Sequence, residues 1–486
     1  MKNFLNIQGK YEKDILNLVN VYLNSPLLIN DLKIDSYDLR ESFAKACIAH
    51  LGNSKKFLNF INDFYSNNLK ESYSFLTKEE VDLAYLFTKK IKKKITFLLE
   101  FKLNYLVKII IFKFIIIFIN FIKFFIRTKK NNPKFLGVGF YVAKNSDKFR
   151  ADKIYSKKYL SDKYLKKFNF LNFISNKYNF DKRFFFFEKY YFTKSKYLII
   201  YKVLISFFLI QQEILSKKKR VVISFEGDHY DHEIIFCLTK IFKIKSICIQ
   251  SATDLNIFPK ACFHNIHQTK YLVWGKHYAK IFKNISPNLK TVVVGNYLLD
   301  LNFKNKTRNK IGIFLKEKND YLNNDEILEF ENFVNWLIVN FNKNILIRPH
   351  PSDTRDDFDI LKYRNVVEID NPNKITVGET LKKCSFIVAC NSSVIVEALS
   401  MGIIPIIFNK STVFEKNIHH LSKSNFKIIS SNIEDLKTRV VKFLSDDKYS
   451  NTLSVTLEKK FKNYINFHGN VSLNKIRQAI SKEVEA

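Results

Sequence analysis

Glycine, proline and cysteine are scarce in this chain of 486 residues, with 11, 8 and 6 copies respectively. Because 47% of the residues are hydrophobic, the composition excludes wholesale disorder and favours a folded core. The cysteines form no Cys-x-x-Cys pair and several lie in apolar runs, so we expect buried free thiols in a reducing compartment. No internal repeat is evident, and the first residues, MKNFLNIQGKYEKD, lack the apolar region of a signal peptide.

The charge is one-sided, with a formal net charge of +34. A nucleic-acid partner is one interpretation of such an excess. Lysine, however, is abundant together with asparagine, isoleucine, phenylalanine and tyrosine, which indicates a genome-wide residue bias. An anionic membrane face is a better target, since each well-placed basic residue contributes about 1 kcal/mol there. We therefore expect a membrane-surface partner and no nucleic acid.

The most apolar stretch runs from Tyr105 to Ile126 and is long enough for a transmembrane helix. On a helical wheel, one arc of about 140° holds a basic and polar stripe. Its members are Lys102, Lys108, Lys113, Asn120, Lys123 and Arg127. Two central lysines would each cost about 3 kcal/mol in a true span. The pattern predicts an amphipathic helix over 102–127 that lies on the membrane surface, with packing on the protein's own core as the main alternative.

Short β-rich runs alternate with helical runs from residue 220 onward, which predicts parallel sheets and an α/β fold. The first series of expected strands is 135–143, 221–225, 246–250, 271–274 and 291–295, with helices near 230–242 and 276–283. A polar linker at 302–309 precedes the second series, with strands at 311–315, 344–348, 366–369, 385–390 and 403–408 and helices near 324–341 and 393–400. We expect a first domain at 1–300, mostly helical over 1–95, and a second at 301–486 with a helical tail from 432.

Ligands bind beyond the carboxyl ends of the strands in open α/β sheets, so the residues after each strand are candidate site residues. The strand at 344–348 is followed by Pro349, His350, Pro351 and Ser352. Two prolines fix the backbone around the histidine, and Arg348 lies two residues earlier on the same face. A rigid histidine beside a cation could bind a phosphate or protonate a leaving group. A surface histidine in a proline turn is the alternative.

The strand at 385–390 is followed by Asn391, Ser392 and Ser393 and then by a helix that Gly402 would end. Backbone N–H groups and two hydroxyls at a helix start predict an anion site. Glu397 lies four residues past Ser393 on the same helix face, where it could accept hydrogen bonds from ribose hydroxyls. An ordinary capped helix with a surface glutamate is the alternative.

An acidic turn with Glu226, Gly227 and Asp228 follows the strand at 221–225. A carboxylate beside a glycine that admits a substrate suits a general base. A merely solvated turn, or a metal site that uses His229, His232 and Glu233, is the alternative, and no second ligand cluster supports a metal. Gln250-Ser251 and Gly295-Asn296 follow other strands and point more weakly to the same cleft.

These motifs resemble those of the GT-B glycosyltransferases that build bacterial surface polysaccharides. The runs RPHPS (348–352), NSSVIVEALSMGIIPII (391–407) and FEG (225–227) look like the His-Pro, Ser-Ser and acidic-Gly motifs of CMP-sialic acid and Kdo transferases. The resemblance implies two Rossmann-like domains that face each other across a cleft. It also implies Glu226 as the acceptor's base, His350 as the residue that holds or protonates the CMP phosphate, Ser392 and Ser393 as phosphate ligands, and Glu397 as the ribose ligand.

The function implied by the resemblance is transfer of a sugar from a nucleotide-sugar donor, a CMP-sugar, to a glycan or lipid-linked acceptor of capsule or lipopolysaccharide. It implies no metal and no cofactor, and a cytoplasmic enzyme on the inner face of the membrane. Phe225 departs from the family by replacing a first acidic residue, and Ser251 by replacing a histidine. CDP-glycerol or ribitol-type phosphotransferases share the His-Pro and Ser-Ser layout and are the first alternative. A non-catalytic basic adaptor on membrane or RNA is the second.

Overall fold

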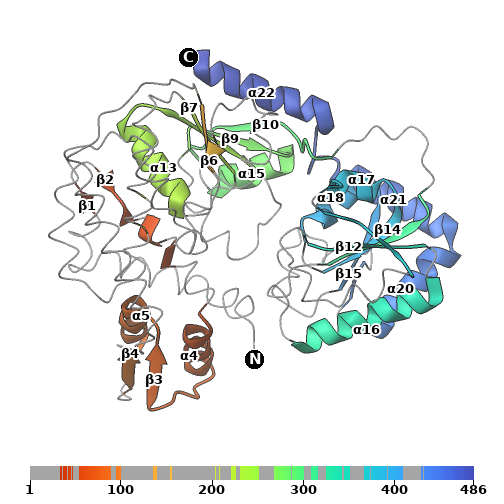
Figure 1. Cartoon of the computed structure of the whole chain (residues 1–486), viewed down its shortest axis with the longest axis horizontal. Coiled ribbons are helices and arrows are strands. Elements are labelled where there is room, and N and C mark those ends of the chain that lie inside the picture. Colours follow the sequence, from red (N-terminus) through yellow and green to blue (C-terminus); the bar gives the residue numbers. More distant parts are fainter. Residues whose placement is uncertain are drawn as a thin grey trace, which may run out of the picture.

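Parallel strands dominate the computed structural model of the chain, which contains two six-stranded sheets side by side (Figure 1). Every neighbouring pair within these two sheets is parallel, as the alternation of strands and helices predicts. The structure describes residues 33–34, 37–40, 42–44, 46–47, 54–88, 95–99, 135–138, 154–155, 203, 207, 221–225, 230–250, 268–285, 287–299, 308–315, 324–341, 344–350, 366–372, 374–390, 392–408, 428–430 and 432–485.

The first sheet has the strand order β10-β9-β8-β7-β5-β6. Its strands are β5 (Phe135–Val138), β6 (Ile154–Tyr155), β7 (Val221–Phe225), β8 (Lys245–Ile249), β9 (Lys270–Val273) and β10 (Thr291–Val293), and its helices include α13 (Tyr230–Ile241) and α15 (Lys276–Ile285). The described side chains of β7, β8 and β9 are mostly buried, as in strands covered on both faces, whereas β10 at the edge of the sheet is half-buried. The strand predicted at 135–143 is observed over 135–138, and the remainder lies outside the described residues.

The second sheet has the order β13-β12-β11-β14-β15-β16. Its strands are β11 (Lys310–Phe314), β12 (Ile345–Arg348), β13 (Glu368–Ile369), β14 (Cys384–Ala389), β15 (Ile404–Phe408) and β16 (Ile429–Ser430), and its helices include α16 (Asn324–Phe341), α17 (Val377–Leu381) and α18 (Val394–Ser400). The two units are Rossmann-like α/β domains in tandem, which is the GT-B arrangement expected from the sequence.

The helical tail divides between the two domains. Helices α20 (Ile433–Ser445) and α21 (Asp447–Phe461) pack against β15 of the second sheet, whereas α22 (Gly469–Glu485) contacts β7 of the first (Figure 1). Ile476 and Ile480 of α22 share a buried cluster with Val221 and Ile223. The boundary expected at 300/301 therefore needs correction for α22, because its apolar stripe is buried against the first sheet.

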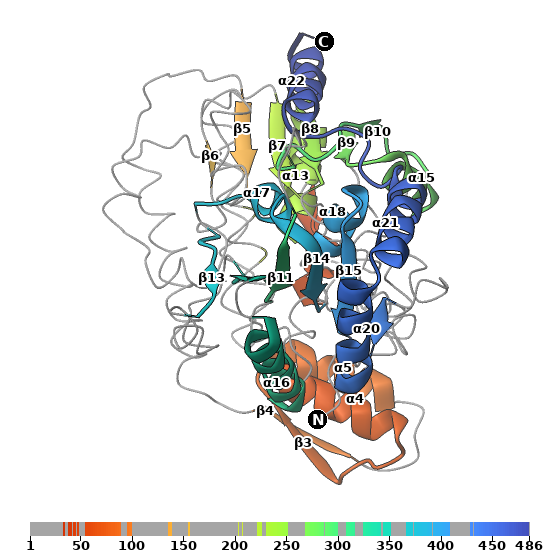
Figure 2. The same cartoon turned by 90° about the vertical axis from the view of Figure 1, so that its right-hand side faces the viewer.

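A small N-terminal unit lies apart from the two large sheets, at one end of the molecule in both views (Figures 1 and 2). It contains α4 (Lys55–Tyr65), β3 (Ser72–Phe75), α5 (Lys78–Thr88) and β4 (Thr96–Leu99). Phe60 lies at its centre, with its ring 5.1 Å from that of Tyr73 and 5.6 Å from that of Phe97. Helices α4 and α5 agree with the mostly helical prediction for 1–95. The strand β3 departs from it, since serines alternate there with buried Tyr73 and Phe75. The antiparallel pair β1 (Lys33–Ile34) and β2 (Tyr37–Asp38) was not predicted either.

The amphipathic helix predicted at 102–127 lies outside the described residues. Among the helices that the structure describes, none is both long and apolar enough to cross a membrane. The membrane-surface helix stays a prediction.

Candidate functional site

The register of the second sheet brings two of the predicted motifs to one edge. Arg348 at the end of β12 and Ala389 at the end of β14 both pair with Phe314 of the strand between them. Pro349 and His350 therefore leave the sheet at the same edge as Cys390 and Ser392. Neighbouring strands lie about 4.8 Å apart, so roughly 10 Å separates the two chain ends. A phosphate with its ribose could span that distance.

Glu397 is the most unusual side chain at this edge. It belongs to α18, is 5% exposed, and its Oε1 accepts a hydrogen bond of 2.9 Å from Nδ2 of Asn296. Burial raises the pKa of its carboxyl to about 7, although the Asn296 hydrogen bond and the charge of Arg348 both act to lower it. The carboxylate and carboxylic acid forms are thus comparably populated near neutral pH, and the ionised form is a strong acceptor for hydroxyl groups.

The serine turn before α18 differs in detail from the expected helix cap. Ser393 occupies the N-cap position, but its side chain makes no capping hydrogen bond. Instead, the Oγ of Ser392 accepts a long bond of 3.4 Å from the N–H of Val394. Helix α18 has only seven residues, so few peptide dipoles add up at its N-terminus. The two hydroxyls remain candidate phosphate ligands, whereas the case for the helix start as an anion site is weak.

Arg348 is directed into the protein, where it makes three polar contacts. Its Nη1 donates to Oγ1 of Thr380 at 2.8 Å and lies 3.5 Å from Oδ2 of Asp370, and its Nη2 donates to the carbonyl of Ile375 at 2.8 Å. Burial lowers the pKa of Arg348, and the charge of Asp370 opposes that effect. The sequence predicts a donor ligand at this position, and the structure instead places an internal anchor there, which fixes the end of β12 just before His350.

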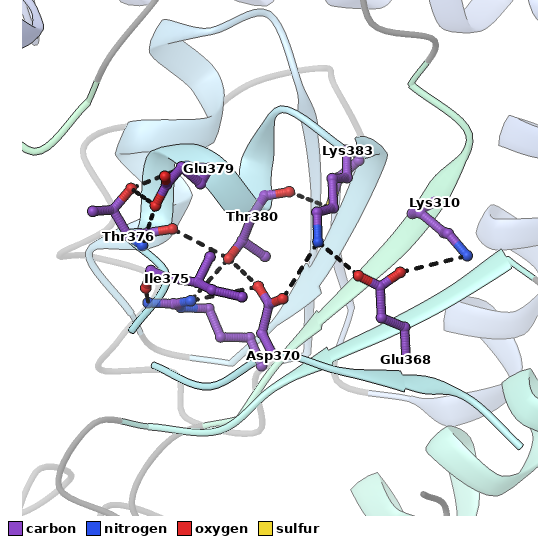
Figure 3. A network of polar contacts seen from close by, with 10 residues as sticks. Lys310, Glu368, Asp370, Ile375, Thr376, Glu379, Thr380 and Lys383 are labelled. Atoms are coloured by element: carbon purple, nitrogen blue, oxygen red, sulfur yellow. Dashed lines mark hydrogen bonds and ion pairs between the residues drawn. The ribbon is translucent and has the colours of Figure 1, made fainter. Parts of the chain in front are cut away.

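The anchor extends into a network of polar contacts that covers the start of α17 (Figure 3). Thr380 also donates to Asp370, and Lys383 lies 2.6 Å from Glu368 and 3.6 Å from Asp370. Sequence reasoning missed this network and α17 itself. The signal was present as Thr-Val-Gly-Glu at 376–379, which forms a capping box with both reciprocal hydrogen bonds.

The carboxyl edge of the first sheet is held by Gln250. This side chain is buried, and its Oε1 accepts from the backbone N–H of Trp274 at 2.9 Å. The indole Nε1 of Trp274 returns a bond of 2.8 Å to the carbonyl of Gln250. Gln250 thus ties the end of β8 to the end of β9, and its predicted contact with an acceptor has no support in this geometry.

Gly295 lies at the junction between the two domains, against the backbone of Phe467. Its φ is +85°, and an added Cβ would collide with the backbone of Phe467. Phe467 belongs to the crossing segment, which we define as residues 462–468 between α21 and α22. The next residue, Asn296, donates its N–H to the carbonyl of Phe467 at 2.9 Å. Gly295 therefore allows the crossing segment to approach the end of the first sheet.

Several predicted site residues lie outside the described residues, so their roles stay predictions. They are Glu226, Gly227, Asp228, Ser251, Pro351, Ser352 and Asn391. His350 is described and half-buried directly after β12. Within the described part of the chain, no group of three or more histidine, cysteine, aspartate or glutamate side chains could hold a metal ion.

Comparisons with known proteins give only solved structures of low sequence identity. No protein-family model matches the chain, and no curated protein matches it. Among solved structures, Staphylococcus aureus MnaA with UDP is 12% identical and covers 72% of this chain and 97% of its own, with a TM-score of 0.44. UDP-GlcNAc 2-epimerase of Methanocaldococcus jannaschii is 16% identical over 72% and 99% of the two chains, with a TM-score of 0.43. A glycosyltransferase of kitacinnamycin is 9% identical over 73% and 100%, with a TM-score of 0.41.

Proposed function

We propose that this chain is a GT-B glycosyltransferase that takes a sugar from a nucleotide-sugar donor bound at the carboxyl edge of the second sheet. One observation supports this proposal most strongly: the buried Glu397, at the start of α18, where the two domains meet. A buried carboxylate is costly unless it has a partner or a function, and a nucleoside ribose offers it two hydroxyl donors.

The proposed chemistry assigns one task to each side of the site. His350, Ser392 and Ser393 hold the phosphate of the donor, and His350 stabilises or protonates it as it leaves. Glu226 removes the proton from the acceptor hydroxyl. The bond between the anomeric carbon and the phosphate oxygen breaks, and a bond from that carbon to the acceptor oxygen forms. The leaving group departs as the nucleotide, and no metal is needed in this scheme.

We further propose a CMP-sugar of the sialic acid or Kdo type as the donor and a surface glycan or its lipid-linked precursor as the acceptor. The motif runs RPHPS and NSSVIVEALSMGIIPII support this choice. The basic composition supports an enzyme on the inner face of the membrane.

Thermal unfolding of the full chain with CMP, CDP, UDP or GDP tests the donor class, because a ligand of the folded state raises Tm by mass action. We expect CMP to give the largest increase. A preference for UDP or GDP would overturn the CMP assignment, and no response to any nucleotide would overturn the transferase. Hydrolysis of a CMP-sugar against CDP-glycerol then separates sugar transfer from the phosphotransferase alternative.

Replacement of His350 by alanine tests the phosphate side of the site. We expect transfer to fall at least 100-fold, the lower range for loss of a general acid or a key charge-stabilising group. Lys459→Ala on the exposed face of α21 is the control and keeps full activity. A His350→Ala enzyme with unchanged transfer and an unchanged circular dichroism spectrum would remove His350 from the mechanism and favour the adaptor alternative.

A further inference from the structure

Asn296 stands where the first domain, the second domain and the crossing segment meet. It is 1% exposed and follows β10 by way of Val294 and Gly295. Its side chain reaches Glu397, 101 positions further along the chain, and no sequence motif links the two. The contact therefore belongs to the tertiary arrangement of the two domains.

Every polar group of Asn296 is in use. Nδ2 donates to Oε1 of Glu397 at 2.9 Å, and Oδ1 accepts from the N–H of Leu298 at 3.0 Å. The backbone N–H donates to Phe467 at 2.9 Å, and the backbone carbonyl accepts from Gly469 at 3.3 Å. Three of these bonds hold Asn296 in place, so that its amide presents a fixed donor to the carboxylate of the other domain.

Few charged side chains among the described residues lie near the carboxylate of Glu397. Arg348 at the end of β12 attracts it, and Glu379 of α17 acts on Arg348 in turn. On α21, Glu458 lies against Gly402, past the far end of α18. The adjoining strands β14 and β15 contribute buried Cys384 and otherwise no ionisable side chain. His468 of the crossing segment is held neutral, because burial lowers its pKa to about 4.

We propose that Asn296 is a positioning residue of the donor site: its amide holds Oε1 of Glu397 across the domain boundary and leaves Oε2 directed to the ribose hydroxyls. The inference rests on the proposed function, because it assumes that Glu397 receives a nucleoside. It adds that the first domain sets the geometry of the nucleotide site in the second. Nucleotide binding and the relative placement of the two domains are therefore coupled through a single hydrogen bond.

The variant Asn296→Asp isolates this bond. Aspartate keeps an oxygen to accept from Leu298 but replaces the donor amide with a second carboxylate oxygen that faces Glu397. At pH 8.5 the wild-type Glu397 is ionised, whereas the aspartate in the variant replaces a donor with a like charge and so destabilises the ionised carboxylate that would accept from the ribose. We expect the affinity for CMP, or for whichever of CMP, CDP, UDP and GDP binds best to the wild type, to fall at least tenfold by calorimetry.

A pH series distinguishes positioning from a structural role. At pH 6 the two carboxyl groups share a proton, which restores a hydrogen bond, so the ratio of variant to wild-type affinity returns toward one. The control is Asn466→Asp, which also adds a charge at the crossing segment and keeps the acceptor for the N–H of Lys276. We expect Asn466→Asp to change affinity less than threefold at either pH.

The double variant Asn296→Asp with Glu397→Gln reverses the polarity of the pair, because the glutamine amide can donate to the aspartate. We expect it to bind the nucleotide more tightly than Asn296→Asp alone at pH 8.5, and it serves as the test if the single variant fails to fold. An Asn296→Asp affinity within twofold of wild type at pH 8.5, or a double variant no better than the single one, overturns the inference. If the wild type binds none of the four nucleotides, the proposed function fails, and this inference fails with it.

Discussion

The two sheets have the same number of strands and all their neighbouring strands are parallel, yet their carboxyl edges are held in opposite ways. The second edge is held by a buried ion pair, Arg348 with Asp370, and its hydrogen-bonded neighbours. The first edge is held by neutral groups, the amide of Gln250 and the indole of Trp274. A buried charge demands fixed partners, so the second edge is the more rigidly specified of the two. Rigidity is what a phosphate site needs.

The largest effect should come from breaking the charged edge. Arg348→Met leaves Asp370, which is 2% exposed, without its buried cationic partner, and we expect a loss of about 3–5 kcal/mol in the free energy of unfolding. Urea denaturation measures it. Gln250→Leu at the neutral edge should cost about 1–3 kcal/mol. Arg439→Met, in the partly exposed i,i+4 pair with Asp435 on α20, should cost only about 1 kcal/mol. Equal losses at 348 and 439 would contradict the comparison.

The next largest effect should come from the junction between the two sheets. Gly295→Ala forces a side chain into a left-handed backbone conformation and against the backbone of Phe467, and we expect a loss of about 3 kcal/mol. Gly402→Ala is the matched change within the second domain, since its φ is +65° but the nearest atoms are side-chain atoms of Glu458 and Ser454 at 3.2 Å. It should cost about 1–2 kcal/mol. Thermal and urea unfolding of both variants would show whether the junction is the stricter position.

The smallest effect is a gain in stability that depends on pH. Glu397 has a folded-state pKa of about 7 against an ordinary value of 4.5, so the free energy of unfolding falls as pH rises between these values and then levels off. Glu397→Gln removes the buried charge and can keep the bond from Asn296. We expect the variant to be more stable than wild type by about 1–3 kcal/mol at pH 8 and equal to it at pH 4. Its nucleotide affinity should fall, and a variant less stable at pH 8 would contradict the cost of burying this charge.

The sequence predicted the strands well where the apolar runs are short, continuous and β-branched, as in VVISF at 221–225 and in the strands at 311–315 and 403–408. It also predicted that His350 and Ser392 reach one edge, because parallel strands place their carboxyl ends together. It could not predict which polar side chains would form hydrogen bonds within the protein and so be directed away from the site. Arg348 and Gln250 find their partners 22 to 32 and 24 positions away, respectively, and local patterns carry no information on such distances.

The same limit explains why the partner of Asn296 and the placement of α22 on the first sheet were not predicted. The amphipathic pattern of α22 shows that one face must be buried, but it does not identify the sheet that buries it. The glycine before Asn296 was visible as a candidate, yet its partner Phe467 lies 172 positions further along the chain. Contacts across the crossing segment depend on how the two domains pack together. The periodicity of hydrophobic residues along the sequence does not determine that packing.

The return of α22 to the first sheet has a consequence for how the chain is made. The strands that α22 covers, β7 among them, leave the ribosome more than 200 residues before it does. At a synthesis rate of about 5–20 residues per second, at least roughly ten seconds pass between the synthesis of Val221 and Ile223 and that of the helix that buries them. During that interval the nascent first domain exposes an apolar surface that a chaperone can recognise. Completion of this buried cluster therefore requires the synthesis of α22.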